Sequence, residues 1–162
     1  MTFLVPYDGS YLAEAALTRA SEYANALEED ITVVTVIPED ESYATQKGWY
    51  DATEDEPFSV PYVAGKLHRE VTDVAPRAAF RYEDTEFESQ ALIAERIQEV
   101  ADDVLPSVVF IGTDNVGEIA EPLTSVAGSV AEDTEYDVHV VRYFSPTTMQ
   151  ELTHEKGAYP ST

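Results

Sequence analysis

Apolar residues along the chain follow two kinds of pattern. Short, nearly continuous apolar runs are typical of buried parallel strands, and they occur at residues 3–7, 31–37, 78–82, 108–111 and 138–144. Between these runs, apolar residues recur at spacings of three and four, which predicts helices over residues 12–27, 60–74, 93–104 and 124–132. This alternation predicts an α/β domain with a doubly wound, Rossmann-like parallel sheet of five strands.

Two connections stand out. Asp8-Gly9-Ser10 follows the first strand, and Ser10 is expected to cap the next helix. Residues 39–58 are irregular and acidic, and a connection of that length is often functional. Two interpretations of its four aromatic side chains stay open: they pin a surface excursion to the domain, or they line a pocket. These are Tyr43, Trp49, Tyr50 and Phe58.

Charge is the unusual feature of the composition. The chain has 162 residues, with 32 Asp and Glu against 9 Lys and Arg, and a formal net charge of -23. Repulsion among so many acids destabilises a compact fold in dilute buffer. At molar salt the Debye length is only about 3 Å, so this repulsion is screened. Because the acids are spread over the whole length, we expect adaptation to a salty cytoplasm rather than one basic partner.

Several classes of function find no support in the sequence. No basic footprint for nucleic acid is present, and no apolar stretch resembles a membrane span or a signal peptide, so we expect a cytoplasmic protein. There is no cysteine, which excludes disulfides and thiolate chemistry. The three histidines lack the spacing of a metal site, and no catalytic motif is found, so neither metal ligands nor catalytic residues are predicted.

Five motifs, taken in order, resemble the universal stress protein family. The turn reading Val5-Pro6-Tyr7-Asp8-Gly9-Ser10 is similar to that family's valine-proline-x-aspartate-glycine-serine, and residues 13–17 continue the likeness into the helix. Residues 34–38, 109–113 and 125–142 match its second strand, its fourth strand and its closing helix and strand. The chain therefore resembles a divergent, haloarchaeal-type member, with a domain over residues 1–144 and a polar tail over residues 145–162.

The resemblance implies a strand order of 3-2-1-4-5 and a homodimer. The dimer would form through the last strand, Val138 to Phe144, and an exposed apolar edge strand does need to be paired or covered. The alternative is that the tail from Ser145 covers this edge.

The resemblance also implies a site for ATP or another adenine nucleotide, bound with magnesium. Asp8 stands at the family's ribose-contacting position and Val36 at its adenine side, whereas Gly112 matches the first glycine of the phosphate loop. Other interpretations stay open, because Asp8 could form a turn, Val36 could be core, and Thr124 and Ser125 could cap a helix. The candidate binding residues are Pro6, Asp8, Val36, Gly112, Asn115, Thr124, Ser125 and Val126.

The phosphate loop departs from the family pattern. Asn115 replaces the second glycine, and Thr124-Ser125 replaces glycine-serine with one residue fewer between; a register through Gly128-Ser129 would cost a helical turn. The loop has no base but three acids, and a carboxylate 4 Å from a phosphate repels it by about 1 kcal/mol even in water. Magnesium could bridge the two. The acids are Asp114, Glu118 and Glu121.

Three hypotheses follow. The first is a stress-response binding or regulatory module with a weak or absent ATP site. The second is an enzyme with slow ATP hydrolysis or nucleotide-dependent signalling through Asp8, Gly112 and Ser125. The third is an interaction protein with a vestigial pocket, in which residues 39–58 bind a partner. The altered phosphate loop favours the first and third over the second.

Overall fold

Five parallel strands form one sheet in the order β3-β2-β1-β4-β5 in the computed structural model, which describes residues 1–112 and 136–142. The predicted α/β class, parallel sheet and strand order are therefore confirmed. The strands are β1 Thr2–Pro6, β2 Asp30–Pro38, β3 Ala79–Thr85, β4 Val108–Ile111 and β5 Asp137–Val140.

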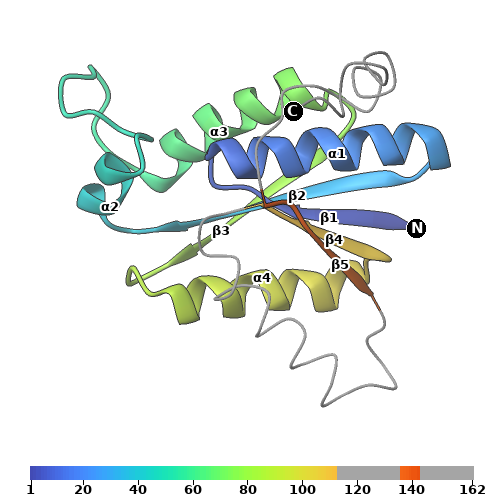
Figure 1. Ribbon diagram of the computed structural model, residues 1–162. Helices are drawn as coiled ribbons and strands as arrows, with labels where there is room; N and C mark the ends of the chain where they lie inside the picture. The colour runs from blue at the N-terminus through green and yellow to red at the C-terminus, as the bar shows by residue number, and fades with distance from the viewer. Residues whose placement is uncertain (113–135, 143–162) are drawn as a thin grey trace, which may run out of the picture.

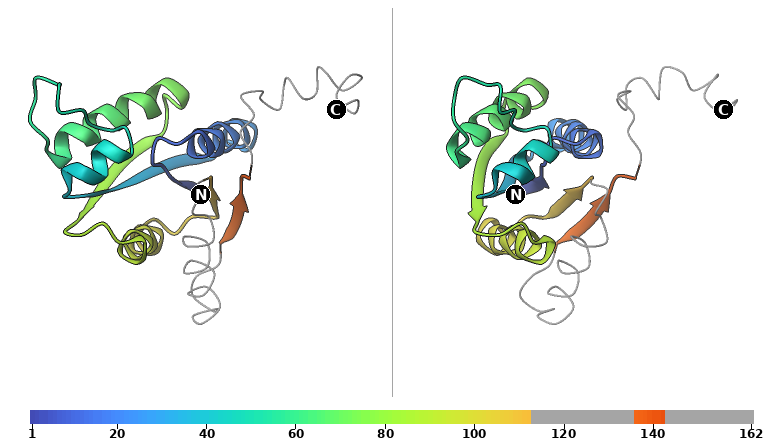
Figure 2. Two further views of the ribbon diagram at one scale, coloured as in Figure 1. Left: turned by 60° about the vertical axis from the view of Figure 1, so that its left-hand side comes forward. Right: turned by 90° about the vertical axis from the view of Figure 1, so that its left-hand side faces the viewer.

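Helices cover both faces of the sheet. Helices α1 and α3 pack on one face and α4 on the other, while α2 lies at the end of the sheet opposite the N-terminus (Figures 1 and 2). In the described part of the chain, no helix is both long and apolar enough to cross a membrane. The helices are α1 Tyr11–Leu27, α2 Glu41–Gln46, α3 Val60–Val74 and α4 Gln90–Val104.

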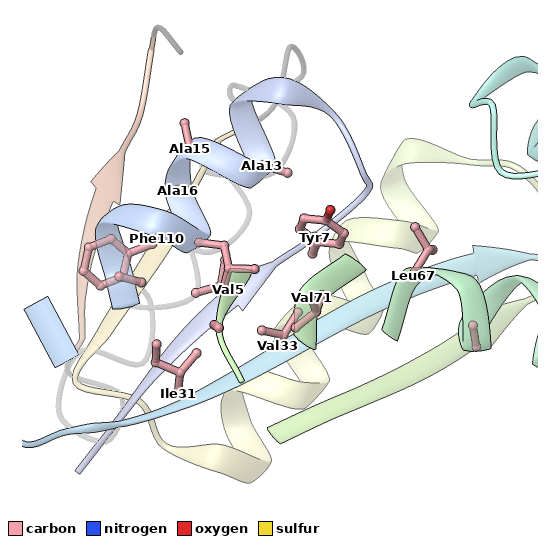
Figure 3. Packing of buried hydrophobic residues seen from close by; sticks show 14 of the residues in the cluster. Val5, Tyr7, Ala13, Ala15, Ala16, Ile31, Val33, Leu67, Val71 and Phe110 are labelled. Atoms are coloured by element: carbon pink, nitrogen blue, oxygen red, sulfur yellow. The ribbon is translucent and has the colours of Figure 1, made fainter. Parts of the chain in front are cut away.

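Alternate side chains of the central strands are buried in two separate hydrophobic cores, one on each face of the sheet. Val5 and Val33 are fully buried against α1 and α3, and Leu4 and Val34 are buried against α4. Figure 3 shows part of the first of these cores, in which α1, with its small buried side chains, lies beside Val5 and the ring of Phe110. Because those side chains are mostly alanine, α1 can lie close to the sheet.

The segment 39–58 is not structureless, which corrects the expectation from the sequence. It contains the short helix α2, capped by Asp40, whose Oδ1 accepts a hydrogen bond from the Tyr43 N–H at 3.1 Å. A helix of six residues spans fewer than two turns, so it shows no apolar periodicity along the sequence. The segment is nevertheless pinned to the domain by its aromatic residues, since Trp49 and Tyr50 are buried.

Smaller boundaries also differ. Ser10 is the N-cap of α1 as expected, because its Oγ accepts from the Ala13 N–H at 3.1 Å. Strand β3 continues past the apolar run at 78–82, because its polar end still pairs with β2 as far as Thr85 opposite Pro38. Strand β5 ends at Val140, so the expected last strand does not include residues 141–142. The expected helix at 124–132, positions 143–144 of the expected strand and the tail at 145–162 lie outside the described residues.

Candidate functional site

The turn after β1 fixes one carboxylate at the carboxyl end of the sheet. Tyr7 still belongs to the sheet, because its N–H donates to the Val34 carbonyl oxygen at 2.8 Å. Asp8 then turns the chain, with Oδ1 accepting from the Ser10 N–H at 3.0 Å, and Gly9 adopts a φ of +80°. The Asp8 side chain is therefore held by its own backbone before any other residue contacts it.

A small cavity opens beside this carboxylate. The ends of β1, β2 and β4 form its floor, α4 forms one wall, and the segment 39–58 forms another. Its volume is about 40 Å³, whereas pockets for drug-sized ligands enclose roughly 300–1,000 Å³. A larger ligand therefore requires the walls to move. The lining is Pro6, Tyr7, Asp8, Val34, Val36, Tyr43, Lys47, Trp49, Gln90, Ile93, Ile97 and Ile111.

Two side chains of the segment 39–58 bind Asp8. Lys47 Nζ lies 2.9 Å from Asp8 Oδ2, and Trp49 Nε1 donates to the Asp8 carbonyl oxygen at 2.9 Å. The Tyr43 ring packs edge-on against Trp49 with centroids 5.6 Å apart, and the ammonium group of Lys47 lies 5.8 Å from the centre of the Trp49 ring. Segment 39–58, which is remote from Asp8 in sequence, therefore covers one side of the candidate site.

Asp8 is ionised in this setting. Burial alone would raise the pKa of its carboxyl group, but the charge of Lys47 and the hydrogen bonds from Ser10 and Lys47 outweigh burial and lower that pKa. A carboxylate with a lowered pKa is a poor general base near neutral pH and a good acceptor for hydroxyl groups. The cavity therefore presents an ionised carboxylate that can accept hydrogen bonds.

A second cluster anchors the same segment farther along. Lys66 Nζ of α3 donates to both carboxylate oxygens of Glu54 at 3.0 Å, and the Tyr62 hydroxyl donates to Oε1 at 2.5 Å. The Tyr62 hydrogen bond and then that from Lys66 lower the pKa of Glu54 to about 2. Segment 39–58 is thus fastened twice, at Asp8 and at α3.

The structure brings three of the predicted site residues together. Pro6, Asp8 and Val36 line one cavity, and their contacts with a nucleotide stay a prediction. Gly112 follows β4 but does not line this cavity. A Cβ there would lie 2.0 Å from the Leu12 carbonyl oxygen, so the close approach of α1 requires glycine. The remaining four, Asn115, Thr124, Ser125 and Val126, lie outside the described residues.

Sequence reasoning missed Lys47 altogether and left the role of Trp49 open. The available signal was scarcity: the chain has only three lysines, and one of them lies in the long connection after the second strand. Across residues 1–112 and 136–142, no three histidine, aspartate or glutamate side chains gather as a metal site would require.

Known proteins resemble the chain in sequence and in fold. The model of the universal stress protein family matches residues 1–142. A universal stress family protein from Burkholderia pseudomallei is 23% identical, with a TM-score of 0.58 over 88% of this chain and 96% of that one. A universal stress protein in complex with cAMP is 21% identical, with a TM-score of 0.52 over 88% and 97%.

A third solved structure, the universal stress protein UspA from Lactobacillus plantarum, is 19% identical, with a TM-score of 0.51 over 88% of this chain and 97% of that chain. At these identities the solved structures support the fold alone. Among curated protein sequences, none matches the chain.

Proposed function

Because the chain belongs to the universal stress protein family, we propose that it is a non-catalytic binding module of the stress response that takes an adenine nucleotide with low affinity. The observation that carries the proposal is the ionised Asp8 carboxylate beside the apolar side chains of Val36 and Ile111 in one cavity. A carboxylate accepts hydrogen bonds from ribose hydroxyls, and an apolar slot accepts a flat base.

The related structure in complex with cAMP supports this choice of ligand class. Its adenine and ribose are chemical groups that a cavity with one apolar wall and one carboxylate can hold. The position of the cavity also agrees with the general rule for open parallel sheets, which bind ligands beyond the carboxyl ends of their strands.

Low affinity follows from the walls of the cavity. A volume of about 40 Å³ is too small for a nucleotide, so Tyr43, Lys47 or Trp49 must shift before one enters. The free energy of that shift reduces the apparent affinity. The acids at 114, 118 and 121 add repulsion toward a phosphate, because the same stretch carries no base.

Calorimetric titration in molar KCl tests the proposal, with AMP, cAMP and Mg-ATP as ligands. We expect saturable binding with a Kd weaker than about 10 μM. Asp8→Asn should weaken that binding about tenfold, because it removes the charged acceptor for the ribose hydroxyls. Asp103→Asn is the matched control, since Asp103 is an exposed carboxylate on α4 that pairs with Arg81 and does not line the cavity.

The absence of heat with every nucleotide would reject nucleotide binding. A Kd below about 10 μM would reject the low affinity while leaving the ligand class intact. Equal losses in Asp8→Asn and Asp103→Asn would show that Asp8 has no special part in binding.

The proposal extends to assembly and setting. We propose a homodimer through β5, which pairs with β4 and with no other described strand, so one of its edges is open in the single chain. We further propose that the protein works in a cytoplasm of molar salt, which the net charge of -23 supports. Light scattering in molar KCl tests assembly: twice the chain mass is expected, and the mass of one chain would contradict it.

A further inference from the structure

The cavity is lined by one positively charged side chain, that of Lys47, which neither the sequence pattern nor the family assignment predicts. Lys47 is the one base among the described residues that line it. Its side chain is only 27% exposed and lies near the face of Trp49, so its ammonium group is partly removed from water. A partly buried ammonium group is stabilised by a negative partner.

That partner is Asp8, but Asp8 does not depend on Lys47 for its position. Asp8 Oδ1 accepts from the Ser10 N–H, and its backbone carbonyl accepts from Trp49. Only Oδ2 is held by Lys47. If Lys47 moves to another anion, Asp8 therefore stays in place, and Oδ2 becomes free to accept a hydroxyl group from a ligand.

The charges around the cavity explain why Lys47 would move from Asp8 to a phosphoryl group. Without Lys47, the described lining would present the single negative charge of Asp8, which repels a phosphoryl group. The stretch from 113 to 124, where the family carries its phosphate loop, has three acids and no base in this chain. The attraction for a phosphoryl group must therefore come from elsewhere, and Lys47 lies at the cavity.

We propose that Lys47 recognises the phosphoryl group of the ligand: it leaves Asp8 as the ligand enters, so that Asp8 binds the ribose and Lys47 binds the phosphate. The cavity then selects nucleotides over uncharged nucleosides. This inference rests on the proposed function, because it assigns a residue of the same site to one part of the same ligand.

The experiment compares AMP with adenosine by calorimetry in molar KCl, for the wild-type chain and two variants. Lys47→Met should weaken AMP binding about tenfold, because a charge-assisted hydrogen bond is lost. The same variant should leave adenosine binding unchanged or tighter, since Lys47 no longer competes for Asp8 Oδ2. Lys47→Arg keeps the charge and should retain the preference for AMP.

Lys66→Met is the matched control. Lys66 is also 27% exposed, also pairs with one carboxylate and also lies over an aromatic ring, but it does not line the cavity. Because Lys66 fastens segment 39–58 through Glu54 without contacting the cavity, any effect of this variant should be equal for AMP and adenosine and should leave the preference for AMP unchanged. Far-UV circular dichroism in the same salt checks that each variant is folded. If Lys47→Met does not fold, the AMP preference of Lys47→Gln decides the matter in the same way.

The outcomes separate the two proposals. If Lys47→Met weakens AMP and adenosine equally, Lys47 only tethers the loop, and the inference is wrong while nucleotide binding stands. If the wild-type chain binds neither ligand, the proposed function itself fails. Inorganic phosphate should not displace AMP at matched concentration. If it does, Lys47 binds any free phosphate anion and does not recognise a nucleotide specifically.

Discussion

Asp8 joins three parts of the molecule at one residue. Its carboxylate accepts hydrogen bonds from the Ser10 N–H at the start of α1 and from the ammonium group of Lys47. Its carbonyl oxygen accepts one from the indole N–H of Trp49. The same residue begins the turn that follows β1. A single carboxylate thus sets the geometry of the cavity and fastens the segment that covers it.

The close contact between Gly112 and α1 leads to a prediction about the stability of the fold. Gly112→Ala should destabilise the fold by about 2 kcal/mol, because the new methyl group would lie 2.0 Å from the Leu12 carbonyl oxygen and must push α1 away. Gly65→Ala is the control: nothing lies within 4 Å of a Cβ there, and α3 should gain about 0.5–1 kcal/mol. Denaturant unfolding of both variants in molar KCl gives the two free energies, and equal effects would refute the steric account.

Glu54 gives a prediction about pH. Its pKa is about 2 in the folded chain, below the ordinary 4.5, so its ionised form stabilises the fold above pH 4.5. That contribution is lost as the pH falls from 4.5 toward 2. The free energy of unfolding of the wild-type chain should therefore exceed that of Glu54→Gln at neutral pH, and the difference should shrink through this range. A difference that stays constant with pH would contradict the assignment.

At the scale of elements, the segment 39–58 is the unusual part. It contains α2, closes the cavity through Lys47 and Trp49, and is fastened again where Glu54 meets α3. These ion pairs and hydrogen bonds supplement the burial of Trp49 and Tyr50, and the side chains that form the ion pairs remain partly exposed to water. The segment is therefore expected to open more easily than the apolar core beneath it.

Trp49→Phe tests how the segment is held. The variant keeps an aromatic ring but loses the hydrogen bond to the Asp8 carbonyl, worth about 1 kcal/mol. Hydrogen exchange of peptides from 39–58 should become about fivefold faster, since each kcal/mol changes the open population by that factor. Peptides from α4 should exchange as before. Equal acceleration in both regions would indicate general destabilisation instead of local opening.

The same elements show how far the sequence could be interpreted. Strands β1, β2 and β4 and helices α1, α3 and α4 were predictable, because each buries apolar residues at a regular spacing. The place of Asp8 was predictable from its turn. Helix α2 and the role of Lys47 were not, because a six-residue helix leaves no periodicity and an ion pair across 39 residues leaves no local pattern.

At the scale of the whole molecule, charge is the dominant property. The formal net charge of -23 acts on all elements at once. In the described part of the chain, Lys47, Lys66, Arg81 and Arg96 form ion pairs with neighbouring acids. Repulsion among the remaining acids favours expanded states in dilute buffer, and salt screens it.

The melting temperature should therefore be higher in molar KCl than in dilute buffer. A variant in which the exposed Glu86, Glu88 and Glu95 are all replaced by glutamine should depend less on salt, because it carries less repulsion. Differential scanning calorimetry measures both. A wild-type melting temperature that does not change with KCl, or a salt dependence equal in the two chains, would contradict the electrostatic account.

Trp49 offers the most direct test of the central claim that the ligand enters the cavity beside Asp8. It is the only tryptophan of the chain, it is buried, and it lines that cavity. Titration with AMP in molar KCl should change its fluorescence saturably, with a midpoint equal to the Kd from calorimetry. Tryptophan emission that stays constant while calorimetry shows saturation would place the ligand elsewhere and contradict the account.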